Sequence, residues 1–334
     1  MSRLSAGGRR GTRVRAWAAS IGLAVALSAA ATLQQPPRGR GNPVRPPDKT
    51  AVWTGVAKVV AVGDLHGAYD EFVIILKGTG LVDEALAWTG GPAHLVQMGD
   101  VLDRGPKAKD IFDLLRRLEK EAEAAGGRVH MLIGNHEAMA LMGLSFDYQG
   151  FVTPEQFVSF VPERIRRRAE TEHRRKEGPG ADLLKMWAET LPLNEGAREA
   201  YFEFLRRDYG RWIATHDTII RIDDTVFVHG GLNDRYAAWT FERINKTIRA
   251  ELLSFVGGIP QPTRVLFDST GPLWYRDLAI RPEDVLEKEL DAVLATIKAK
   301  ALVIGHTATG GSRTLEPEGM SRFGGKVWNI DTGI

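Results

Sequence analysis

The stretch AKVVAVGDLHG, residues 57–67, joins an apolar run to a glycine-flanked turn that carries Asp64 and His66. A short apolar run rich in valine is typical of a buried strand, and the glycines let the backbone turn sharply behind it. The same design, an apolar run followed by Asp, Asn or His beside glycine, recurs five times. We therefore expect five more buried strands, at residues 93–98, 128–133, 225–228, 301–304 and 326–330.

Helical stretches between these runs indicate an α/β architecture. Between the second and third runs, apolar residues spaced three and four apart predict an amphipathic crossover helix with Ile111, Leu114, Leu115 and Leu118 on its buried face. Residues 150–215 have a helical but heavily charged pattern, and they predict a helical insertion. The charged run there fits either a solvated helix face or a cap over the active site, and the sequence leaves both open.

The composition is that of a globular protein. Of 334 residues, 43% are hydrophobic and 26% are charged, and the absence of cysteine excludes disulfides and thiolate chemistry. The formal charge of +2 depends on five arginines before residue 34, because the rest of the chain has 39 basic and 42 acidic residues. A domain so close to neutrality has no electrostatic footprint for nucleic acid, so we expect no nucleic-acid partner.

Residues 1–33 have the three-part layout of an export signal, with a basic stretch, an uncharged stretch and small residues at 28–31. We interpret them as a cleaved signal peptide, which predicts a periplasmic or secreted protein. The alternative is an uncleaved anchor in the inner membrane, and only then do we expect membrane contact. Residues 34–50 are a disordered Pro/Arg linker by composition, and residues 51–334 are expected to form the catalytic domain.

The polar residues that follow the six strands should meet, because ligands bind at the carboxyl ends of strands in α/β sheets. Their oxygen and nitrogen atoms suit manganese, iron or zinc. Six ligands are too many for one four-coordinate ion and fit two ions that share a carboxylate, an arrangement that can clamp both oxygens of a displacement at phosphorus. The set predicts metal-assisted hydrolysis of a phosphate ester: Asp64, His66, Asp100, Asn135, His229 and His306.

Each motif alone is weak evidence, since a lone GDLHG can be a simple turn and a lone histidine after a strand is more often structural. Their joint order after apolar strands carries the prediction. The histidines outside the motifs are interpreted as structural or surface groups: His94, His130, His173 and His216.

The motifs, taken in order, resemble those of the calcineurin-like metallophosphoesterases: GDLHG (63–67), GDVLDRG (99–105), GNHE (134–137), HGG (229–231) and GHT (305–307). The second and third resemble the phosphoprotein phosphatase branch in particular. Three further stretches are most similar to the bacterial Shewanella-like protein phosphatases: FVHGGL (227–232), GPLWYRD (271–277) and the closing IDTG. The resemblance spans residues 60–333 and implies a β-sandwich flanked by helices.

The resemblance also implies a dinuclear metal site. Asp64 and His66 would hold the first ion and Asp100 would bridge the two. The second ion would be held by Asn135, His229 and His306. Manganese is favoured over iron and zinc, although these ligands accept all three.

By the same resemblance, His136 would be the general acid that protonates the leaving oxygen, and Asp103 would orient it. Arg104 and Arg276, together with Asn135, would bind the phosphoryl oxygens. For Arg276 an ordinary surface salt bridge remains an alternative. Asp331, after the last strand, is expected to support the site without binding a metal.

The resemblance implies a phosphomonoesterase in which a metal-bound hydroxide attacks the phosphate of a phosphorylated protein, peptide or small phosphoester. For the Shewanella-like group the resemblance implies phosphotyrosine at least as much as phosphoserine or phosphothreonine, and the sequence does not decide between them. The alternative within the superfamily is hydrolysis of a diadenosine polyphosphate or another nucleotide. A silent metal-binding protein would be expected to lack the acid or a ligand, and all of these positions are intact.

Overall fold

The computed structural model describes residues 51–190, 195–259, 262–309 and 320–333. The predicted signal peptide (1–33) and linker (34–50) lie outside the described residues. In the described part of the chain, no helix is both long enough and apolar enough to cross a membrane.

A three-stranded parallel sheet comes first in the chain and contains β2 (Val59–Val62), β3 (His94–Gln97) and β4 (Arg128–Met131), in that spatial order. Its crossover helices are α1 (Tyr69–Gly78) and α2 (Ala108–Ala124). The four apolar residues predicted on the inner face of α2 are all buried. The residue two places after α2 is Gly126, whose φ of 80° ends the helix in a left-handed turn.

A six-stranded mixed sheet has the order β1-β5-β6-β7-β9-β8, with antiparallel pairing between β5 and β6 and between β8 and β9. Its strands are β1 (Val52–Trp53), β5 (Ile219–Ile222), β6 (Thr225–Val228), β7 (Ala301–Ile304), β8 (Ser321–Arg322) and β9 (Val327–Asn329). All six predicted strands are present in the two sheets, whereas β1, β5 and β8 were not predicted. Two of these are only two residues long, and β5 contains Arg221, whose guanidinium donates to carbonyls at the end of the last long helix.

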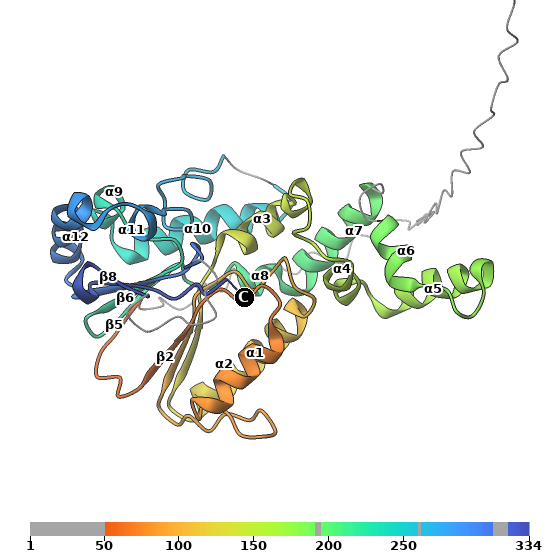
Figure 1. Cartoon of the computed structure of the whole chain (residues 1–334), viewed down its shortest axis with the longest axis horizontal. Helices are drawn as coiled ribbons and strands as arrows, with labels where there is room; N and C mark the ends of the chain where they lie inside the picture. Colours follow the sequence, from red (N-terminus) through yellow and green to blue (C-terminus); the bar gives the residue numbers. More distant parts are fainter. Residues whose placement is uncertain (1–50, 191–194, 260–261, 310–319, 334) are drawn as a thin grey trace, which may run out of the picture. The chain divides into compact units, whose positions relative to one another are not determined.

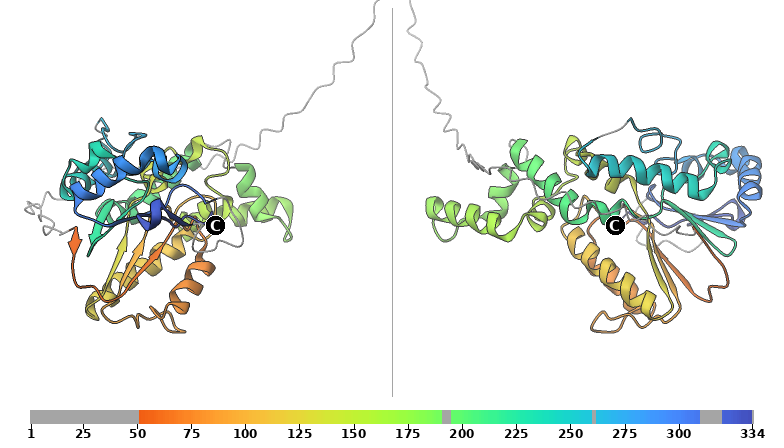
Figure 2. Two further views of the ribbon diagram at one scale, coloured as in Figure 1. Left: turned by 60° about the vertical axis from the view of Figure 1, so that its left-hand side comes forward. Right: turned by 180° about the vertical axis from the view of Figure 1, so that it is seen from behind.

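The two sheets pack face to face, which confirms the predicted sandwich. Side chains from both sheets form one buried apolar layer: Val96, Met98, Leu132, Ile220, Ile222, Phe227 and Val303. Figures 1 and 2 show helices on the outer sides, with α1 and α2 beside the smaller sheet and the C-terminal helices beside the larger one. Those C-terminal helices are α9 (Asp234–Ala237), α10 (Phe241–Val256), α11 (Asp277–Ile280) and α12 (Glu283–Ile297).

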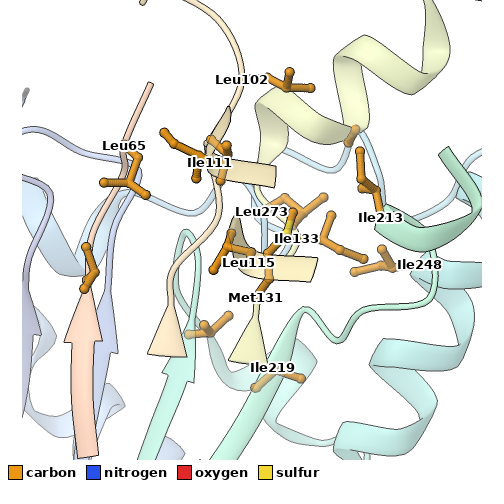
Figure 3. Close-up of a cluster of buried hydrophobic side chains, with 14 of the residues drawn as sticks. Leu65, Leu102, Ile111, Leu115, Met131, Ile133, Ile213, Ile219, Ile248 and Leu273 are labelled. Atoms are coloured by element: carbon orange, nitrogen blue, oxygen red, sulfur yellow. The ribbon is translucent and has the colours of Figure 1, made fainter. Parts of the chain in front are cut away.

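A second and larger core joins the helices to the sheets. Figure 3 shows part of it, where Leu115 of α2, Ile133 after β4 and Ile248 of α10 lie in one cluster of buried side chains. Ile133 also donates its backbone N–H to Asp217 just before β5, which ties the end of the smaller sheet to the larger one. The residues that follow β4 are therefore held on both sides.

The predicted insertion is helical. It comes after α3 (Asn135–Met142) and contains α4 (Pro154–Phe160), α5 (Glu163–Glu177), α6 (Leu183–Thr190), α7 (Glu195–Leu205), the π-helical turn η2 (Arg206–Gly210) and α8 (Arg211–Ile213). The charged helix α5 buries no residue, as a solvated helix does. Figures 1 and 2 show α5 and α6 beyond α4 and α7, on the side away from the sheets. The members of the insertion that approach the strand ends are α4 and α7.

Candidate active site

The strand ends of both sheets meet at one place, and their turns share an unusual backbone. Five residues other than glycine have positive φ there: His66 (40°), Asp100 (53°), Asp103 (70°), Arg104 (66°) and His306 (67°). L-residues rarely adopt this conformation, and examples cluster at active sites because the surrounding structure has to hold them.

Two glycines bring backbone against the carboxylates of the site. A Cβ atom on Gly134 would overlap the Asp100 side chain, and one on Gly305 would overlap the Asp64 side chain. These positions in GNHE and GHT thus need glycine for space, independently of φ. The histidine that follows Gly305 donates its backbone N–H to Asp64 Oδ2 at 3.0 Å.

Asp100 lies at the centre of the cluster. Its Oδ2 is 3.9 Å from Nε2 of His66 and 3.9 Å from Nε2 of His136, while its Oδ1 is 3.3 Å from Nε2 of His229. Among the described residues, two groups have donor atoms close enough together to hold an ion, and Asp100 belongs to both. One group adds His66 and His136, and the other adds His229 and His306.

Hydrogen bonds to the backbone fix the orientation of two of these rings. Nδ1–H of His66 donates to Leu102 O at 2.8 Å, and Nδ1–H of His229 donates to Met98 O at 2.8 Å. The Nε2 atom of each ring then faces Asp100. A second nitrogen held in this way is the usual arrangement of a metal-binding histidine.

His306 supplies a direct test of whether a metal fits. Its Nε2 is buried and has no hydrogen-bond partner among the described residues. Burial and the nearby His229 lower the pKa of His306 to about 2, so its ring is neutral. A buried, neutral nitrogen without a partner is costly unless it binds an ion.

The charges of the cluster lead to the same conclusion. Burial raises the pKa of Asp64 well above its ordinary value, and Asp100 and Asp331 add to the rise. Burial disfavours the charged form of His229, but Asp100 and Asp64 outweigh it and raise the pKa of His229 to about 10. The cluster is thus short of positive charge, which divalent cations would supply. The residues present fit the metal ions that were expected from the motifs.

Asn135 is the first residue of α3, and its Oδ1 lies 2.9 Å from Nε2 of His229. The next residue, His136, donates its backbone N–H to Asp100 Oδ1 at 2.9 Å. All six predicted ligands therefore lie in one buried cluster. Their roles as ligands remain a prediction.

The predicted acid pair is also assembled. Nδ1–H of His136 donates to Asp103 Oδ2 at 2.7 Å, and both side chains are buried. Burial opposes the imidazolium, but Asp100 and the hydrogen bond to Asp103 outweigh it, so the pKa of His136 lies above its ordinary value. Nε2 of His136 faces Arg104, whose Nη2 is 3.5 Å away. A proton on this nitrogen would thus face an arginine that is predicted to bind phosphate.

The two predicted arginines differ in how they are held. Arg104 is exposed at the tip of its turn, with its guanidinium near His136. Arg276 donates from Nη1 to His306 O at 2.7 Å and to Thr307 Oγ1 at 3.0 Å. These partners place Arg276 beside a predicted ligand, whereas the alternative was a surface salt bridge.

The sequence analysis assigned no role to Glu137, the last letter of GNHE. Its buried carboxylate accepts backbone N–H groups from Gly134, Asp100, Val101 and Leu102 at 2.8 to 3.1 Å. It thus clamps the turn that carries Asp100 to the start of α3. A Glu three residues after Gly134, as in a capping box at the start of a helix, was the available signal.

Gln156 was also missed. Thr153 caps α4 by accepting from Gln156 N, and the Gln156 side chain is fully buried against Asp103. Its Oε1 accepts from Asp103 N at 2.8 Å, and its Nε2 donates to Asp103 Oδ1 at 3.2 Å and to Tyr201 Oη at 2.8 Å. The insertion therefore holds the carboxylate that holds His136.

Comparisons with known proteins agree with this geometry. The family model of the calcineurin-like phosphoesterases matches residues 57–323. The chain is 32% identical over 266 residues to Shewanella-like protein phosphatase 2 of Arabidopsis thaliana. The matched region covers 75% of this chain and 66% of that relative, so the chain spans just under two thirds of the relative's length.

A solved structure is similar over most of the chain. The cold-active protein-tyrosine phosphatase of a psychrophilic Shewanella species is 26% identical with a TM-score of 0.59, covering 85% of this chain and 74% of that chain. A symmetrical bis(5'-nucleosyl)-tetraphosphatase of Enterobacter is 32% identical, but over 76 residues that cover 23% of this chain and 22% of that protein.

Proposed function

The chain belongs to the calcineurin-like phosphoesterase family, and from this premise we propose that it is a metal-dependent phosphomonoesterase that acts on phosphorylated proteins or peptides. One observation carries the proposal. Asp100 lies between His66 on one side and His229 and His306 on the other, and the His136–Asp103 pair lies directly beside it. A dinuclear centre next to a proton donor is what cleavage of a phosphate ester requires.

Each residue of the site has its own role in the proposed reaction. The two divalent ions of the family, when bound, supply a nucleophile from water and polarise the phosphoryl group. Arg104 and Arg276 bind the phosphoryl oxygens, since a planar guanidinium makes paired, charge-assisted contacts. His136 gives the proton on Nε2 to the ester oxygen as its bond to phosphorus breaks. Asp103 stabilises the imidazolium before this transfer.

We propose manganese as the metal. Carboxylate, amide and imidazole donors support a hard or borderline ion, and the chain has no cysteine to favour a softer one. The test is to prepare metal-free protein by chelation, restore it with manganese, iron or zinc, and measure both the bound metal and the rate. Higher activity with zinc or iron at equal metal content would overturn the choice of manganese.

The function is tested with the restored protein and three substrates: p-nitrophenyl phosphate, phosphopeptides and a diadenosine polyphosphate. We expect hydrolysis of the first two with release of inorganic phosphate. The short likeness to the tetraphosphatase supports the nucleotide alternative less than the long likeness to protein phosphatases supports this one. Cleavage of the dinucleotide alone would reverse the assignment.

Export to the periplasm or beyond is a separate proposal, supported by the layout of residues 1–33. Expression of the full chain in a bacterial host, followed by fractionation and N-terminal sequencing, tests it. Cleavage near residues 28–31 with the protein in the periplasm is the expected result. An intact N-terminus in the membrane fraction would support the anchor instead.

A further inference from the structure

Helix α5 of the insertion separates its charges between two sides. Its fifteen residues include seven basic and four acidic ones. The acids in the middle of the helix, Glu170 and Glu172, are partly buried. Five arginines are exposed, and steps of three or four residues that pass through Thr171 place them on one face of the helix. We call this surface the arginine face: Arg164, Arg167, Arg168, Arg174 and Arg175.

Most of the positive charge on the arginine face is not paired within the protein. Glu163, in the first turn of α5, forms a salt bridge with Arg167. In the described part of the chain, no salt bridge involves Arg164, Arg168 or Arg175. A helix that is merely solvated usually carries charges of both signs along its exposed side. The arginine face is therefore more one-sided than solvation alone requires.

The arginine face lies outside the machinery of the active site. Gln156 of α4 bonds to Asp103 and to Tyr201 of α7, whereas α5 packs on α6. Figures 1 and 2 show α5 beyond α4 and α7, on the side away from the sheets. The two apolar residues of α5, Ile165 and Ala169, are partly buried. The exposed face thus offers charge along a straight rod about 22 Å long, without apolar side chains.

We propose that the arginine face of α5 docks the protein on the surface of a bilayer rich in anionic phospholipids. A planar guanidinium makes paired, charge-assisted contacts with phosphate, and a straight row of them can contact many headgroups of a flat layer at once. Basic amphipathic helices are typical of proteins that bind membrane surfaces. This contact does not need residues 1–33, so it is separate from the anchor considered above.

A bilayer suits the arginine face better than an acidic peptide does. A peptide is usually held by pockets or apolar contacts in addition to charge, and α5 exposes only polar side chains. A peptide on this face would also lie at the outer end of the insertion and not at the strand ends. A layer of phosphate groups needs only charge and reach, and each arginine near such a layer strengthens binding by about fivefold.

The experiment measures how full chains sediment with vesicles, after the N-terminus of each purified protein has been sequenced. One set of vesicles is phosphatidylcholine, and the other contains equal parts of phosphatidylcholine and phosphatidylglycerol. The test variant combines Arg164→Glu, Arg168→Glu and Arg175→Glu. We expect the wild-type chain to bind the anionic vesicles and the test variant to bind them about a hundredfold more weakly. Salt of about 0.5 M should remove most of the wild-type binding, because it screens exposed charges.

A matched control changes the net charge by the same amount elsewhere. It combines Lys120→Glu, Lys246→Glu and Lys288→Glu, at exposed positions of α2, α10 and α12. We expect this control to bind anionic vesicles within about threefold of the wild-type chain, since it leaves the arginine face intact. Both variants should hydrolyse p-nitrophenyl phosphate at the wild-type rate, which shows that the fold and the active site are unchanged.

Four results would overturn the inference. Equal binding to both kinds of vesicle would assign the contact to residues 1–33, and equal losses in the two variants would assign it to net charge. Wild-type binding by the test variant would show that the arginine face does not contact lipid. If the test variant lost only kcat/KM on an acidic phosphopeptide, the face would serve a peptide. Vesicle binding needs no turnover, so this test does not depend on the proposed phosphatase function.

Discussion

The metal-ligand half and the acid half of the site are built by different parts of the molecule. Asp64, Asp100, His229 and His306 follow β2, β3, β6 and β7, and their positions are set by the two sheets. His136 follows a strand as well, but its carboxylate partner is held by Gln156 of the helical insertion. The metal-ligand half thus depends on the strand ends and the start of α3, and the acid half depends in addition on the helical insertion.

The difference teaches how one scaffold can keep its chemistry while it changes its substrate. The strand ends carry the predicted metal ligands, so changes there should remove activity altogether. The insertion contacts Asp103, the partner of His136, through Gln156, and its Phe151 ring lies against the ring of His136. Changes in the insertion should therefore alter how well, and on what, the protein acts.

The largest expected effect is that of Asp100→Asn, which removes the charge shared by both ion groups. We expect turnover to fall by about a thousandfold or more, with loss of both metal ions. Activity assays together with metal analysis measure this. Asp331→Asn is the matched control, since Asp331 is a buried acid in the same cluster and is not a predicted ligand. It should keep both ions, and wild-type turnover of Asp100→Asn would refute the shared role.

His136→Asn tests the acid half. Loss of a general acid costs on the order of 10² to 10⁴ in rate, and the ions should stay bound because the strand ends are unchanged. The rate is measured over a series of aryl phosphates with different leaving groups. Good leaving groups need little protonation, so the loss should shrink for them. A uniform loss across the series would contradict the assignment of His136 as the acid.

The arginines are expected to act mainly on substrate binding. Arg104→Lys keeps the charge but loses the planar pair of donors, and we expect KM to rise about tenfold, as for the loss of a charge-assisted hydrogen bond. Arg276→Lys should raise KM similarly and also loosen the turn that carries His306. Steady-state kinetics on p-nitrophenyl phosphate measure both. Arg235→Lys, at an exposed ion pair with Asp268, is the control.

Gln156→Leu gives a smaller effect and tests the link to the insertion. It leaves Asp103 without two hydrogen bonds, and we expect kcat to fall about tenfold with unchanged metal content. The loss should be greater for poor leaving groups, because it acts through His136. Tyr201→Phe removes only the bond from Gln156 to the phenol oxygen and should cost about two- to threefold. An equal loss for all leaving groups would indicate a purely structural role.

The sequence predicts the metal-ligand half well because each ligand follows an apolar run, and a strand end is a local feature. The strands β1 and β8 were not predicted because each is two residues long, which is too short to give an apolar pattern. They are strands only because they pair with neighbouring strands. β5 escapes because Arg221 interrupts its apolar pattern and serves a distant helix end.

The residues that hold His136 and Asp103 in place could not be predicted from the sequence in the same way. Gln156 lies 53 positions from Asp103 in the chain. No sequence pattern around a single glutamine reveals that the Gln156 side chain is fully buried against Asp103. The Phe151 ring reaches His136 from a later stretch of the chain, and this contact depends on the path of the loop. In both cases the fold, and not the local sequence, decides the contact.

The left-handed turns at the strand ends imply a conflict between thermal robustness and catalysis. Each such residue raises the energy of the folded chain by roughly 1 kcal/mol compared with glycine at the same place. Arg104→Gly would relax its turn and could raise the melting temperature while it deletes the guanidinium. A laboratory selection for heat resistance alone would thus enrich variants without activity. Such a selection would have to measure product formation at every round.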